Sequence, residues 1–143
     1  MTAQGSTTRL GEVCFLVAVP AALAGMVAGI VMGATQNFIL APAHAHLNLL
    51  GWVSMALFGL YYRGAEVPTP RLARVQVAVS AVGFWAMPVG LALYLGLDDH
   101  RFEPLVYGGA RLSLAGMGMF AVVVVMATVR RGAAGPMRLA RAP

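Results

Sequence analysis

The chain has 143 residues, of which 59% are apolar and only 10% are charged. Soluble domains carry about 25% charged residues, so a single small soluble core does not hide this many apolar side chains. The ten basic residues, all arginine, exceed the five acidic ones and give a net charge of +5. We interpret this excess as a membrane-topology signal and not as a nucleic-acid surface. The composition also excludes a separate soluble catalytic domain.

Four apolar stretches follow one another along the chain. A helix that spans a bilayer needs about 20 consecutive apolar residues, and we place spans at residues 13–33, 43–62, 75–97 and 105–129, between tails at 1–12 and 130–143. The sequence therefore predicts an all-α integral membrane four-helix bundle. A secretory signal is the alternative for the first stretch, with Arg9 as its basic flank. That stretch is longer than the usual signal core and lacks a clear small-x-small cleavage site.

Glycine and proline positions predict how the first two spans begin and pack. Gly25, Gly29 and Gly33 recur every four residues, which lines one helix face with bare backbone and allows another helix to approach closely. Pro42 suits the first turn of the second helix, because its missing N–H would have no intrahelical partner there. We therefore expect a short connection at residues 36–42 and a packing surface on the first span.

The arginines predict the orientation of the bundle. Eight of them lie in the two tails or around the loop between the second and third spans: Arg9, Arg63, Arg71, Arg74, Arg130, Arg131, Arg138 and Arg141. The loop at residues 98–103 is net acidic. Because basic residues are enriched on the cytoplasmic side, we expect four crossings of a bacterial-type inner membrane with both termini cytoplasmic. The C-terminal tail, rich in Gly, Ala, Pro and Arg, is expected to be mobile.

The strongest polar exception within the spans is the pair His44 and His46 in the first turns of the second span. Buried imidazole costs free energy unless it is hydrogen-bonded or bound to a metal. Residues two apart in a helix point about 200° away from each other, so the pair is badly placed to hold one metal ion together. We expect the two imidazoles to serve two different sites with partners from elsewhere. The alternative is that they only donate hydrogen bonds to neighbouring carbonyls or headgroups.

The segment that carries these histidines, AHAHLNLLGW at residues 43–52, continues into FGLYY at 58–62. It resembles the histidine-bearing helices of subunit I of the haem–copper oxidase and nitric oxide reductase superfamily. In that family, twelve spans form three arcs of four with pseudo-threefold symmetry, and the second helix of each arc supplies ligands. The resemblance implies that this chain is similar to one arc and assembles as a homo-oligomer, with a homotrimer preferred.

The resemblance also implies a cofactor and a role. It implies a haem held by His44 and His46, with one imidazole from each of two adjacent copies, and a redox or electron-transfer function with an unidentified redox partner. The chain has no C-x-x-C-H motif for covalent attachment, so the haem would be a non-covalent b-type haem. The chain lacks the further histidines of the family's copper centre. Whether it is an enzyme stays open, because a haem with two histidine ligands has no free coordination position.

Four further residues are candidates for the same site. Arg111 lies six residues into the fourth span, about 9 Å along the helix axis, where it pairs with a haem propionate or extends outward to the membrane surface. Trp52 stacks on the porphyrin or packs in the core, and Asn48 orients a ligand or caps a neighbouring helix. Met32 lies at a depth close to that of His44 and is a soft potential metal ligand.

Two other functions remain open on the sequence alone. The first is a copper or haem handling protein that uses His44, His46 and Met32 as ligands and performs no redox catalysis. The second is a small accessory subunit whose histidines make only hydrogen bonds. His100, in the acidic outer loop, is interpreted as a solvated residue, and Cys14 as a small buried side chain.

Overall fold

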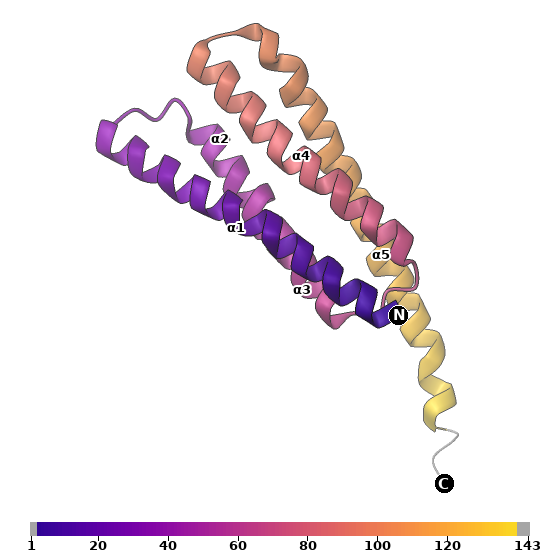
Figure 1. Ribbon diagram of the computed structural model, residues 1–143. Coiled ribbons are helices and arrows are strands. Elements are labelled where there is room, and N and C mark those ends of the chain that lie inside the picture. Colours follow the sequence, from indigo (N-terminus) through magenta and orange to yellow (C-terminus); the bar gives the residue numbers. More distant parts are fainter. Residues whose placement is uncertain (1–2, 140–143) are drawn as a thin grey trace.

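The computed structural model describes residues 3–139, with side chains described for 7–132, and this part of the chain is all-α (Figure 1). Four helical rods run up and down, and the second is built from three consecutive segments. In chain order the elements are α1 (Ala3–Thr35), α2 (Ala41–His46), η1 (Leu47–Ser54), α3 (Met55–Gly64), α4 (Pro70–Leu97), η2 (His100–Phe102) and α5 (Glu103–Leu139).

The rods are long and apolar enough for a membrane protein. Within the described residues, three helices qualify by length and hydropathy, namely Thr7–Thr35, Pro70–Leu97 and His100–Gly132. The second rod joins segments of 6, 8 and 10 residues without a break, which together exceed the roughly 20 residues that a span needs. The expectation of an all-α membrane protein is confirmed, and a fourth crossing by the second rod stays a prediction.

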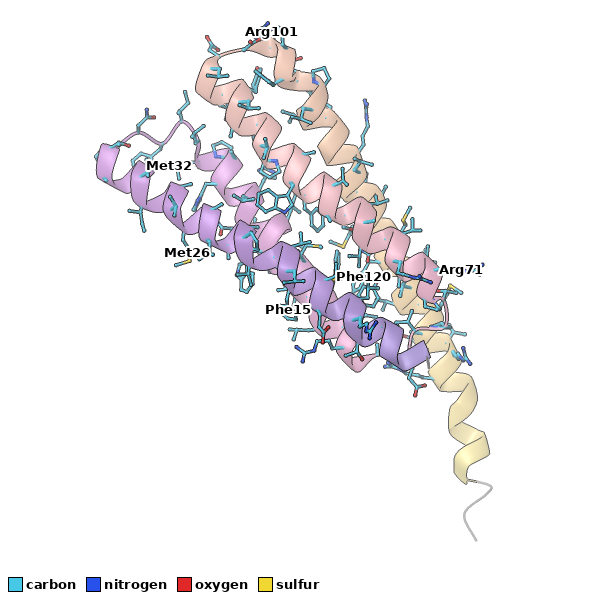
Figure 2. All side chains as sticks on the ribbon, in the orientation of Figure 1. Phe15, Met26, Met32, Arg71, Arg101 and Phe120 are labelled. Atoms are coloured by element: carbon cyan, nitrogen blue, oxygen red, sulfur yellow. The ribbon has the colours of Figure 1, made fainter. Side chains whose placement is uncertain are left out.

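The course of the rods brings the two ends of the chain to the same end of the bundle. The start of α1 and the lower part of α5 lie at one end of the bundle, and the connections α1–α2 and α4–α5 lie at the opposite end (Figure 1). Arg71 marks the end that holds the termini, and Arg101 marks the other (Figure 2). This arrangement is the one that a chain with both termini on one side of a membrane requires.

The helices extend further than the predicted spans. α1 begins at Ala3, within the predicted tail, and α4 begins at Pro70, within the predicted loop. α5 continues to Leu139, through most of the predicted C-terminal tail, and residues 140–143 lie outside the described part. The expected mobility of that tail stays a prediction. Spans were placed by hydropathy, whereas helix continues through polar flanks because Ala, Arg, Met and Leu are good helix formers.

The second rod departs from regular α-helix in its middle. Pro42 occupies the first turn of α2, as predicted, but the eight residues Leu47–Ser54 form a π-helix before α-helix resumes at Met55. One side-chain hydrogen bond has the same five-residue spacing as the π-helix: Ser54 Oγ donates to the carbonyl of Leu49 at 2.9 Å. π-helical turns are rare and occur frequently at functional sites. This one begins directly after the histidine pair.

The core lies in the half of the bundle that holds the chain ends. Its largest fully buried side chains include Tyr62, Phe58, Phe84 and Met55. The ring of Phe58 packs on Phe120 of α5 with 4.3 Å between centroids, and on Phe84 of α4 with 6.0 Å between centroids. These aromatic contacts fix α3 against α4 and α5.

A chain of polar side chains crosses this apolar core. The hydroxyl of Tyr62 donates to Gln76 Oε1 at 2.8 Å, and Gln76 Nε2 donates to Ser80 Oγ at 2.9 Å. All three residues are buried. Buried polar groups are costly unless paired, so these bonds specify the register between α3 and α4.

We expect Tyr62→Phe to lower the free energy of unfolding by about 1–3 kcal/mol, because the change leaves Gln76 Oε1 buried without its donor. Chemical denaturation of the purified protein in mild detergent measures the difference. Tyr61→Phe is the matched control, since the Tyr61 hydroxyl makes no hydrogen bond to any described residue and its side chain is only half-buried. Equal losses in the two variants would contradict a role for the Tyr62–Gln76 bond.

Candidate functional site

His44 is held against α1 by a hydrogen bond to main chain. Its Nδ1 lies 2.9 Å from the carbonyl oxygen of Gly25, and its side chain is half-buried. A carbonyl oxygen only accepts, so Nδ1 carries the proton and Nε2 of the neutral ring keeps its lone pair. This is the usual arrangement of a metal-binding histidine, in which one ring nitrogen is fixed by a carbonyl and the other is the ligand.

His46 has the same type of restraint on its own helix. Its Nδ1 lies 2.8 Å from the carbonyl oxygen of Pro42, one turn earlier, and its side chain is half-buried. The proton therefore sits on Nδ1 here too, and Nε2 is left as an acceptor. Because α2 is a regular helix, the two side chains leave it in opposite directions, and only His44 bonds to α1. The two rings thus have different hydrogen-bond partners, one on α1 and one within α2.

The glycine face of α1 is the surface on which the His44 side chain rests. A methyl group on Gly29 would lie 3.1 Å from His44 Cε1, and one on Gly25 would lie 2.5 Å from Asn48 Oδ1. Gly33, the third member of the series, has no neighbouring atom within 4 Å of such a methyl group. The predicted packing surface is therefore confirmed for two of its three glycines, and it receives the candidate site residues.

Asn48 contacts His44, which lies one helical turn earlier on the second rod. Its Nδ2 donates to the carbonyl of His44 at 3.0 Å and lies 3.4 Å from each ring nitrogen of the same residue. Equal distances to both nitrogens place the amide across the ring and not in line with the Nε2 lone pair. Asn48 thus hydrogen-bonds to the main chain of His44 and packs against its ring. Its amide makes no well-aligned hydrogen bond to Nε2.

A small apolar pocket lies beside His44. Its volume is about 120 Å³, and it is lined by Ala28 of α1, by Leu40, Ala43, His44 and Leu47 of the second rod and its approach, and by Pro88, Val89 and Ala92 of α4. Pockets that hold drug-sized ligands measure about 300–1,000 Å³. One copy of the chain therefore does not enclose a porphyrin at His44. Val89, an exposed lining residue, shows that the pocket reaches the surface of the bundle.

Arg111 lies near this level of the bundle but outside the pocket. Two contacts between α4 and α5 give its height along the bundle: Gly109 of α5 lies against Met87 of α4, and Ser113 of α5 lies against Gly83 of α4. Arg111 lies midway between them, about one helical turn from Pro88. Its side chain is exposed, and no described residue forms an ion pair with it. The fold therefore does not bring Arg111 to the histidines within one copy. An unpaired arginine in a membrane-spanning helix is costly, so its exposed side chain either extends to the membrane surface or has a partner outside the chain.

Trp52 and Met32 do not join the histidines in one group of ligands. Trp52 lies in the π-helical segment, half-buried against the apolar core, which matches the packing alternative. Met32 is buried near the outer end of α1 (Figure 2). Within the described residues, no three side chains of His, Cys, Asp or Glu form a group that could hold a metal ion.

The outer loop closes the same end of the bundle with ion pairs. His100 is exposed and its Nδ1 lies 2.7 Å from Glu103 Oε1, as expected for a solvated residue. The Arg101 guanidinium donates to Asp99 at 2.6–3.1 Å, and these hydrogen bonds hold the pKa of the Asp99 carboxyl below its usual value. The carboxylates of Asp99 and Glu103 are therefore paired within the loop.

Comparison with known proteins gives no further assignment: no protein-family model matches the chain, and neither a curated protein nor a solved structure shows significant similarity to it. The site is thus described by its own geometry. Two imidazoles, each hydrogen-bonded at Nδ1 to a carbonyl, lie at the start of the second rod, directly before a π-helical segment.

Proposed function

We propose that the protein binds a b-type haem non-covalently through His44 and His46 and has an electron-transfer role in the membrane. The observation that carries the proposal is the hydrogen bonding of the two rings: each Nδ1 is bonded to a main-chain carbonyl. Each Nε2 is then left as a neutral nitrogen ligand. Haem needs at most two such axial ligands, and when bound it would carry single electrons.

The haem would lie between copies of the chain. The pocket at His44 is too small for a porphyrin, and the two imidazoles leave their helix in opposite directions. One imidazole from each of two adjacent copies satisfies both facts. The resemblance of residues 43–52 to haem–copper oxidase subunit I favours a trimer, with three four-helix units around one axis and the termini on the cytoplasmic side of an inner membrane.

Arg111 completes the proposed site from the neighbouring helix face. Its guanidinium is exposed and unpaired among the described residues, and it lies within about one turn of the pocket level along the bundle. Guanidinium groups match carboxylates with paired hydrogen bonds. We assign it to a haem propionate held at the interface between copies.

The test is a visible absorption spectrum of the full-length protein purified from haem-replete cells. We expect a Soret band, a low-spin spectrum with two imidazole ligands, and loss of most bound haem in His44→Ala and in His46→Ala. His100→Ala is the matched control, because that ring is exposed and bonded only to Glu103. Native mass spectrometry of the same samples gives the haem-to-chain ratio and the number of copies.

Three results would overturn the proposal. They are a wild-type protein without a Soret band, a spectrum unchanged when both histidines are replaced by Ala, and stoichiometric copper without haem. The last would instead support copper handling. Arg111→Ala should lower haem retention and shift the midpoint potential, whereas Arg101→Ala should change neither. Equal behaviour of these two variants would remove Arg111 from the site and leave the histidine assignment standing.

A further inference from the structure

Five exposed arginines gather at the end of the bundle opposite the histidines: Arg63, Arg71, Arg74, Arg130 and Arg131. They come from the end of α3, the first turns of α4 and the lower part of α5. The rings of Tyr61 and Tyr62 contact Phe120 with centroids 5.2 and 6.1 Å apart, which holds the end of α3 against α5. The three elements therefore bring their arginines to the same end of the bundle, which we call the basic end.

The charges of the basic end are not balanced within the chain. Both ion pairs among the described residues lie in the outer loop, at the other end of the bundle. Near the basic end the described acidic residues are Glu12 and Glu66, both exposed and in no ion pair. Among the described residues, Arg74 Nε lies 3.4 Å from the carbonyl of Pro70, and the aliphatic part of the Arg63 side chain packs on Gly11 of α1.

The start of α4 adds a second reason to expect an anion. Arg71 and Arg74 lie in its first turns, where the partial positive charge of a helix N-terminus disfavours cations. The first turn holds no acidic residue, and Thr69 at the N-cap position makes no side-chain capping bond. The Thr69 hydroxyl oxygen is buried without a hydrogen-bond partner. A helix start with free N–H groups and two arginines is arranged for a phosphate-type oxyanion.

We propose that the basic end binds the phosphate headgroup of an anionic phospholipid, with Arg71 and Arg74 at the start of α4 as the principal donors. A lipid is the source that fits the position. The apolar helices end at this level, the half-buried Tyr61 lies beside it, and aromatic side chains are typical of the membrane–water interface. Clusters of arginine next to a membrane span are typical of anionic-lipid recognition.

Native mass spectrometry tests this assignment on the full-length protein in mild detergent. Phosphatidylglycerol and phosphatidylcholine of identical acyl chains are added separately, and their binding constants are compared. We expect phosphatidylglycerol to bind more tightly, and the combined change Arg71→Gln and Arg74→Gln to weaken its binding about thirty-fold. Each arginine near an anionic surface contributes roughly a five-fold change. Phosphatidylcholine binding should stay unchanged.

Arg101→Gln is the control for net charge, because it removes one arginine at the opposite end, where Arg101 is paired with Asp99. It should leave the preference for phosphatidylglycerol intact, and a thermal melt confirms that each variant is folded. Equal binding of the two lipids, or equal effects of the Arg101 and Arg71/Arg74 changes, would overturn the proposal. Displacement of the lipid by millimolar inorganic phosphate would also overturn it, because the ligand would then be a soluble anion.

Discussion

Replacing Gly109 by Ala is expected to lower the free energy of unfolding by about 1–3 kcal/mol, the usual cost of overpacking a close contact. α4 and α5 approach so closely here that a methyl group on Gly109 would overlap the backbone nitrogen of Met87 and lie 2.7 Å from its Cα. Backbone atoms do not move aside as a flexible side chain does. The two helices must therefore separate, and neighbouring contacts loosen with them. Thermal or denaturant unfolding in mild detergent measures the loss.

Gly108 provides the control for this substitution. It is the preceding residue of the same helix, and a methyl group there has no neighbouring atom within 4 Å. Gly108→Ala should leave stability unchanged or raise it slightly, because Ala is the better helix former. If the two variants show the same change in stability, the close α4–α5 contact at Gly109 does not determine the cost of the substitution.

The second large effect is expected at Gly25, where α1 meets the histidine site. A methyl group on Gly25 would lie 2.5 Å from Asn48 Oδ1 and 2.8 Å from Asn48 Cγ. The amide must move, and with it the bonds that Asn48 and the Gly25 carbonyl make to His44. We expect Gly25→Ala to lower the free energy of unfolding by about 1–3 kcal/mol and to weaken any cofactor held by His44.

Gly33→Ala is the matched control on the same glycine series, since no atom lies within 4 Å of the added methyl group. It should keep wild-type stability and cofactor content. Unfolding can be measured on protein without a cofactor, so this result tests the packing at Gly25 independently of the haem proposal. A Gly25 variant as stable as the Gly33 variant would show that the Asn48 side chain relaxes freely.

Much of the architecture could be predicted from the sequence because membrane spans obey simple rules. The lengths of the apolar stretches predicted the four rods, and Pro42 predicted the start of the second rod. The four-residue spacing of Gly25 and Gly29 predicted the face of α1 on which the second rod packs. The divergence of His44 and His46 followed from helix geometry alone. Each of these features depends on local chemistry, which the sequence displays directly.

Features that depend on packing between rods were missed. The π-helical segment Leu47–Ser54 has no residue pattern that distinguishes it from α-helix in an apolar run. The Tyr62–Gln76–Ser80 chain was visible only as two uncharged polar residues inside a predicted span, and its partner on α3 depends on the fold. Hydropathy also set the helix ends too early or too late, since it reports the membrane boundary and not the helix boundary.

The π-helical segment also sets the rotational phase between the two halves of the second rod. An α-helix advances about 100° per residue, and a π-helical turn closes its hydrogen bonds with one residue more than an α-helical turn. The direction in which His44 and His46 point, relative to the core residues Met55 and Phe58 below, therefore depends on the number of residues between them. Because the wider turn absorbs about one residue, deleting one residue from this segment would allow continuous α-helix with the histidine face still turned toward the glycines of α1.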